Sequence, residues 1–107
     1  MNEGQGRGGV PPWLLGRWRL QRAEEGVEIL PGTLMEFRGS GVLVYRIPLE
    51  GEAHVFELEY SVRGDLLCTR HAAAGHAQTV RFGQPVAGEL ELDFAGVRAW
   101  FSRETLM

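Results

Sequence analysis

The sequence predicts an all-β fold: an antiparallel up-and-down barrel of about eight strands, preceded by a short N-terminal helical turn. Two observations favour this fold. Segments in which apolar and polar residues alternate recur from residue 14 to the C-terminus, and a period of two is typical of half-buried strands. Short turns rich in Gly and Pro separate these segments. Consecutive antiparallel strands of this kind close into a barrel because closure leaves no sheet edge unpaired.

The N-terminal segment differs in composition from the rest of the chain. Residues 1–9 are glycine-rich and polar, so we expect a disordered tail followed by one domain over residues 10–107. Pro11–Leu15 is expected to form a single helical turn, because Pro is tolerated in a first turn and Trp and Leu give it an apolar side.

The first strand, residues 14–21, carries a large aromatic residue on its inner face. Trp18 alternates there with Arg17 and Arg19, which point outward. We interpret Val27–Gly32 as a loop or a short edge strand. The remaining expected strands cover residues 33–38, 42–47, 53–62, 66–71, 78–82, 89–94 and 97–103.

Three short turns set the register between neighbouring strands. They are the three-residue turn Gly39–Gly41 and the two-residue turns Gly64-Asp65 and Ala95-Gly96. Longer reversals are expected at Pro48–Glu52 and Ala72–Ala77. The predicted cross-strand pairs are Phe37 with Leu43, Met35 with Tyr45, Val62 with Leu67, Tyr60 with Thr69, Leu58 with His71, Phe94 with Val97, Leu92 with Ala99, and Asp93 with Arg98.

Two short motifs give the chain a family resemblance. Gly16-Arg17-Trp18 stands in the first strand, and Phe101-Ser102-Arg103 closes the last one. Together with the strand rhythm, this resembles the lipocalin-like (calycin) small barrels. The resemblance implies that Trp18 packs at the closed end of the barrel and that Arg103 lies over it. It also implies that the helical turn at Pro11–Leu15 plugs one open end of the barrel; the alternative is that Trp13 stacks on a ligand. The chain is shorter than a typical lipocalin and lacks a Thr-Asp-Tyr motif and a disulfide pair.

The predicted inner face is mostly apolar, with a few polar groups among the apolar side chains. Small-molecule sites have this composition, so the function we expect is the binding of a small apolar ligand in the barrel. The alternative is a filled core whose tyrosine hydroxyls reach loop carbonyls or water. The candidate ligand-binding residues are Tyr45, Phe56, Leu58, Tyr60, Thr69 and His71.

The sequence shows no catalytic constellation, metal site or cofactor motif, so we expect no enzyme activity. Cys68 and His71 lie three residues apart in a strand and therefore point to opposite faces, which prevents them from sharing a metal ion. No phosphate-binding glycine loop occurs. An isomerase activity, which some lipocalin-like barrels host, remains the alternative.

Charge and composition bear on partners and compartment. A net charge of -3 gives no reason to expect nucleic acid as a partner. No apolar run approaches the ~20 residues of a membrane span, and the N-terminus lacks the apolar core of a signal peptide. The single Cys68 suits a reducing compartment, so we expect a cytoplasmic protein.

A second hypothesis assigns the function to the outer surface. Trp100 is predicted to lie on the outside of the barrel, opposite Glu91, and exposed Trp residues are enriched among interface anchors. With Val55, Leu66 and Cys68 it would form an apolar patch through which the protein associates as a homodimer. The alternative is a lone surface aromatic that covers the side chain of Arg98.

Overall fold

The fold was taken from a computed structural model that describes residues 10–27, 29–71 and 75–104. The expected disordered tail, residues 1–9, lies outside the described residues. A 3-10 turn, η2 (Pro12–Leu14), precedes eight strands in the described part of the chain. The strands are β1 (Gly16–Ala23), β2 (Leu34–Phe37), β3 (Val42–Leu49), β4 (Glu52–Arg63), β5 (Leu66–His71), β6 (His76–Gly83), β7 (Glu89–Phe94) and β8 (Val97–Arg103).

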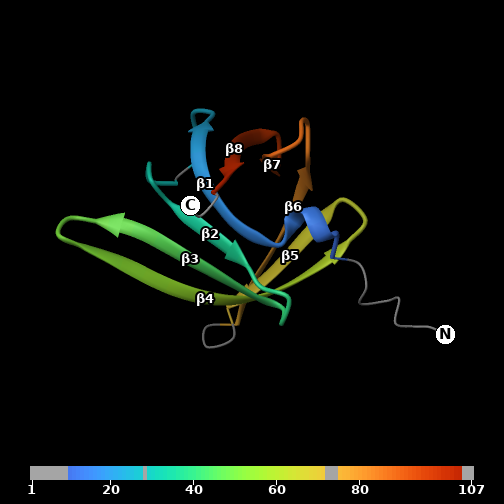
Figure 1. The fold of residues 1–107 in the computed structure, drawn as a ribbon, viewed down its shortest axis with the longest axis horizontal. Helices are drawn as coiled ribbons and strands as arrows, with labels where there is room; N and C mark the ends of the chain where they lie inside the picture. The colour runs from blue at the N-terminus through green and yellow to red at the C-terminus, as the bar shows by residue number, and fades with distance from the viewer. Residues whose placement is uncertain (1–9, 28, 72–74, 105–107) are drawn as a thin grey trace.

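The strands pair in sequence order, each antiparallel to the next, and β8 pairs with β1 (Figure 1). This closed barrel confirms the predicted fold class. The closing pair places Trp18 opposite Arg103 and Leu20 opposite Phe101, with a bulge between Leu20 and Arg22. The bulge is a local irregularity of the kind that bends a strand and helps a sheet to curl closed.

The short turns set the register as predicted. The turn at Gly39–Gly41 pairs Phe37 with Leu43, and Gly41 has the expected positive φ of 90°. The predicted pairs in the β4–β5 and β7–β8 hairpins also form, except Leu58 with His71. The β4–β5 ladder ends one pair earlier, and His71 instead pairs with His76 of β6.

Two predicted reversals are shorter than expected. β3 continues to Leu49 and β4 begins at Glu52, so the reversal predicted over Pro48–Glu52 is only a two-residue turn. Pro48 is tolerated because β3 has no β2 partner beyond Arg46 and is an edge strand there. The loop predicted at Ala72–Ala77 also ends early, since β6 already begins at His76.

The core fills the half of the barrel that η2 covers, which we call the closed end. Leu14 of η2 is fully buried, and Trp13 packs against Trp18 and Phe82, with ring centroids 6.2 and 5.8 Å away. The turn therefore plugs this end, as predicted. The buried cluster comprises Leu14, Trp18, Met35, Phe37, Leu43, Tyr60, Val62, Leu67, Val80, Phe82, Leu90, Leu92, Ala99 and Phe101.

The opposite end of the barrel is open, because several strands there extend beyond their neighbours. Residues 47–58 of β3 and β4 pair with each other but with neither β2 nor β5. They form a projecting hairpin, called the arm below (Figure 1). β7 pairs only with Arg81–Gly83, so β6 before Arg81 has a partner on one side only, β5. The sheet from β3 to β6 therefore reaches past the end of β7.

Candidate functional site

The closed end is held by contacts around the guanidinium group of Arg103. Its Cζ lies 4.4 Å from the centroid of the Trp18 ring, where the resemblance implied it would lie. Nη1 donates a hydrogen bond to the carbonyl of Leu15 at 2.8 Å, and Nη2 donates one to the carbonyl of Trp13. The Trp18 indole N–H donates to the carbonyl of Leu14 at 2.9 Å. One arginine thus ties the end of β8 to η2 and to Leu15, the residue between η2 and β1.

Gly16 makes this approach possible. A Cβ atom at this position would lie 2.6 Å from Nη1 of Arg103, and the backbone φ is +113°. Any side chain would displace the guanidinium, and most residues would also be strained at this φ. Gly16, Trp18 and Arg103 therefore form one packing unit.

The open end contains the hollow that best fits the predicted ligand site. A pocket of about 390 Å³ lies between β4, β5 and β6. We call it the mouth pocket. It is lined by Leu58, Thr69, His71, His76, Ala77 and Gln78. The pocket exists because β6 extends past β7, which leaves the inner face of its first residues uncovered.

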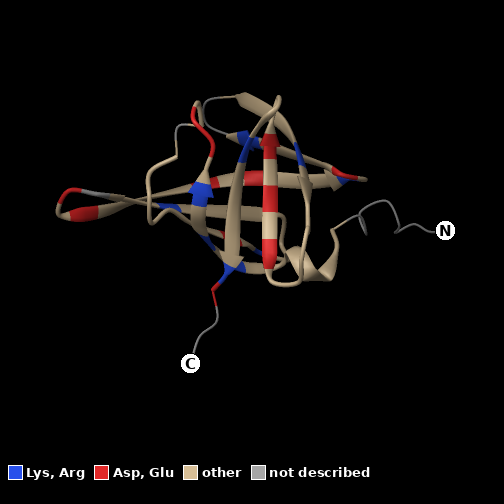
Figure 2. Ribbon diagram, turned by 90° about the horizontal axis from the view of Figure 1, so that it is seen from above, with Lys and Arg blue, Asp and Glu red and all other residues tan. Residues whose placement is uncertain are grey.

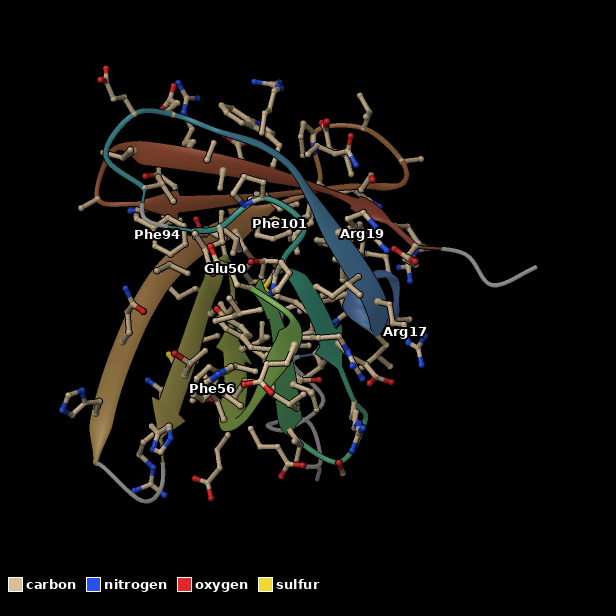
Figure 3. The ribbon with its side chains drawn as sticks, turned by 90° about the vertical axis from the view of Figure 1, so that its left-hand side faces the viewer. Arg17, Arg19, Glu50, Phe56, Phe94 and Phe101 are labelled. Atoms are coloured by element: carbon tan, nitrogen blue, oxygen red, sulfur yellow. The ribbon has the colours of Figure 1, made fainter. Side chains whose placement is uncertain are left out.

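The predicted site residues divide between the two ends. Leu58, Thr69 and His71 line the mouth pocket. Phe56 lies two residues before Leu58 on the same face of β4, in the arm, where it is opposite Tyr45. Its exposed fraction is 40%. Figure 3 shows Phe56 on the arm side of the open end and Phe94 at the end of β7, in the opposite layer. Burial raises the pKa of the Tyr45 hydroxyl above its usual value, which keeps this group neutral below about pH 10.

Tyr60 is placed differently from the other candidates. Its hydroxyl donates a hydrogen bond of 2.7 Å to the carbonyl of Arg38 in the β2–β3 turn at the closed end. Its ring packs edge-to-face on Phe37 with centroids 5.1 Å apart. This arrangement is the one the filled-core alternative describes for a tyrosine hydroxyl.

Comparison with known proteins gives a fold. No protein-family model matches the chain, and no curated protein matches it. Among solved structures, a lipocalin-like protein from Bacteroides uniformis superposes with a TM-score of 0.72 at 17% identity, over 86% of this chain and 99% of its own. The chain has a lipocalin-like fold. An uncharacterized protein from Bacteroides eggerthii superposes with a TM-score of 0.67 at 12% identity, over 85% of this chain and 99% of its own.

Three lining residues of the mouth pocket were not predicted from the sequence. The sequence predicts a loop at His76 and Ala77 and the start of a strand at Gln78, whereas β6 begins at His76. A signal was present: Gly75 has a positive φ of 74°, and a strand that begins directly after it places His76 opposite His71 and Gln78 opposite Thr69. In this lipocalin-like barrel the inner face of β6 therefore begins two residues earlier than predicted.

Trp100 is covered by its own chain. The guanidinium of Arg22 lies 3.8 Å from the Trp100 ring centroid and that of Arg98 lies 5.8 Å away. The ring is half-buried, and Glu91 is its partner on β7. These contacts favour the alternative, a surface aromatic that packs under arginines, although the nearer arginine is Arg22. The homodimer remains a prediction.

Within residues 10–27, 29–71 and 75–104, no three His, Cys, Asp or Glu side chains come together in a group that could hold a metal ion. In the same part of the chain, no helix has the length and apolar character needed to cross a membrane. Cys68 is a half-buried free thiol whose Sγ lies 3.8 Å from Thr79 Oγ1.

Proposed function

We propose that the protein binds a small, largely apolar ligand at the open end of its barrel, in the mouth pocket. The observation that carries this proposal is the shape of the barrel. Its closed half is filled with side chains, whereas its open end holds a hollow of about 390 Å³. A lipocalin-like fold is consistent with this role, because a barrel of eight strands is just wide enough for side chains or one small ligand.

The lining suggests how a ligand would be held. Leu58 and the exposed ring of Phe56 offer apolar surface for the body of the ligand. Thr69 and Gln78, which are directly opposed on β5 and β6, offer a hydroxyl and an amide to one polar group. A mostly apolar molecule with a single hydroxyl or carbonyl group fits this arrangement best.

The test uses adjacent positions of β6 that point to opposite faces. Gln78→Trp should fill the mouth pocket, whereas Thr79→Trp adds the same ring on the outer face. The probe is the neutral dye N-phenyl-1-naphthylamine, whose fluorescence rises in apolar surroundings. We expect the wild-type protein and the Thr79 variant to bind it at micromolar concentrations, and the Gln78 variant to bind at least about tenfold more weakly.

Two results would contradict the proposal. One is a wild-type protein that does not enhance the dye's fluorescence at tens of micromolar. The other is equal binding by the two tryptophan variants, which would place the dye elsewhere on the barrel. Circular dichroism of both variants shows whether the barrel is intact, so that a loss of binding can be attributed to the pocket.

A further inference from the structure

The outer surface of the barrel has a hollow of its own, separate from the mouth pocket. It has a volume of about 280 Å³ and lies over β1, β2, β3 and the base of the arm. We call it the outer groove. Its lining includes the side chains of Arg17, Leu34, Arg38, Val44, Arg46 and Val55.

The floor of the outer groove is apolar. Val44 points outward, since its neighbour Leu43 is fully buried on the inner face, yet Val44 is only 8% exposed. Leu34 and Val55 flank Arg46 on the two neighbouring strands, and Val55 is 51% exposed. Aliphatic side chains on the outer face of a sheet normally meet water, so a recessed aliphatic floor is available to an apolar group.

Two arginines lie beside this floor. Neither Arg17 nor Arg46 forms a salt bridge with any described residue. Arg17 contributes to lowering the pKa of the Glu104 carboxyl, but Arg19 already binds both oxygens of that carboxylate, at 2.8 and 2.9 Å. Among the described residues, no carboxylate is ion-paired with the guanidinium groups of Arg17 and Arg46, which leaves both available to an anion.

The register places these two arginines within reach of one ligand. Arg17 pairs with Glu36, which pairs with Val44, and Arg46 lies two residues beyond Val44 on β3. Two strand spacings separate them by roughly 10 Å across the sheet and two residues by roughly 7 Å along it. Because arginine side chains are long and both point outward, they can converge over Leu34.

The two acidic residues of the groove flank Val44 on its neighbouring strands. Glu36, which is also opposite Arg17, is bridged by Arg38 at 3.4 Å. Glu57 lies on β4, at the far side of the groove from Arg17, and forms no ion pair with a described residue. Figure 2 shows acidic and basic residues interleaved along the strands, with acidic residues at the tip of the arm. In a protein of net charge -3, a groove lined by three arginines and two glutamates is a local site of positive charge.

We propose that the outer groove binds a small organic carboxylate with an apolar body. A guanidinium group presents a planar pair of donors that matches a carboxylate. Arg17 and Arg46 supply one guanidinium group each. The apolar body then covers Val44 and Val55. This site differs from the mouth pocket in that Arg and Glu side chains line it, and in its position on the outside of the barrel.

The test is a titration of 15N-labelled protein with octanoate, followed by amide chemical shifts. Octanoate should shift the amides around Val44 and Val55 and leave Gln78 of the mouth pocket unchanged. Arg46→Gln should weaken binding by roughly tenfold, since it removes one charge-assisted contact. Arg63→Gln is the matched control, because it removes an equally exposed arginine of β4 outside the groove. Glu57→Gln should tighten binding severalfold by removing a repulsive charge.

Several results would overturn the proposal. Octanol binding as tightly as octanoate would show that the carboxylate is not recognised. Equal weakening by the Arg46 and Arg63 variants would indicate only a general charge effect. Weaker binding by the Glu57 variant would show that the groove prefers a cationic group. Shifts confined to the amides around Gln78 would also overturn it and would leave the mouth pocket as the binding site.

Discussion

The contacts of Arg103 can be tested by one substitution, Arg103→Ala. The guanidinium lies 4.4 Å from the centroid of the Trp18 ring, which is fully buried, and donates hydrogen bonds to the carbonyls of Leu15 and Trp13. A cation over an aromatic ring contributes about 0.5–2 kcal/mol. Hydrogen bonds to charged groups contribute about 1.5–3 kcal/mol each, although water can hydrogen-bond to the two carbonyls once the arginine is removed and so offset part of the loss.

These contributions set the expected size of the effect. After allowing for water at the two carbonyls, we expect Arg103→Ala to lower the free energy of unfolding by about 3 kcal/mol. For a domain of this size that corresponds to a fall in Tm on the order of 10–20 °C. Arg103→Lys keeps the charge but not the planar pair of donors, so its loss should be about half as large.

The assay is urea unfolding followed by circular dichroism, with Arg22→Ala as the matched control. Arg22 also lies over a tryptophan, at 3.8 Å from the Trp100 centroid, but on the outer surface and without a hydrogen bond to a described carbonyl. Its substitution should cost no more than about 1 kcal/mol. If Arg103→Ala costs no more than Arg22→Ala, then the hydrogen bonds to η2 and to Leu15 do not stabilise the barrel and the reasoning is wrong.

Two further predictions concern stability. Gly16→Ala should lower the free energy of unfolding by about 1–3 kcal/mol, because its Cβ would lie 2.6 Å from Arg103 Nη1. Gly96 has a similar φ but no atom within 4 Å of a Cβ, so Gly96→Ala should lower it only by the backbone strain of about 1 kcal/mol. Equal urea midpoints for the two variants would refute the steric argument. Burial raises the pKa of Tyr45 and Tyr60 above 10.0, so the unfolded chain loses these protons first as the pH rises. The stability that they contribute should therefore be complete below about pH 10 and decline above it. Tyr45→Phe should flatten this decline in urea unfolding, and an unchanged slope would exclude Tyr45 as a cause.

The local part of the architecture follows from the sequence. Alternation of apolar and polar residues places each side chain on the inner or outer face, as Met35 and Glu36 illustrate. The turns at Gly64-Asp65 and Ala95-Gly96 then set the register of their hairpins, since a two-residue turn allows only one pairing. These features depend on residues close in sequence, which is why they could be predicted.

Contacts between residues far apart in the sequence were harder to predict. The donation from Tyr60 to the Arg38 carbonyl joins residues 22 positions apart, and the sequence left open whether this hydroxyl faced a cavity or a turn. Arg22 and Trp100 meet only because β1 and β8 close the barrel, with a bulge that shifts their register by one residue. Neither alternation nor turn chemistry carries information about such a shift.

Residue type and spacing alone determined that this chain forms an up-and-down barrel with an apolar inner face, preceded by a short helical turn. The tertiary structure alone decided where strand pairing stops: β4 pairs with β5 only from Glu59 onward, and β6 pairs with β7 only from Arg81 onward. These limits of pairing contribute to the arm and the mouth pocket. The physical reason is that a strand's length reflects its own residues, whereas the end of its pairing depends on how far the neighbouring strand reaches once twist and closure have positioned both.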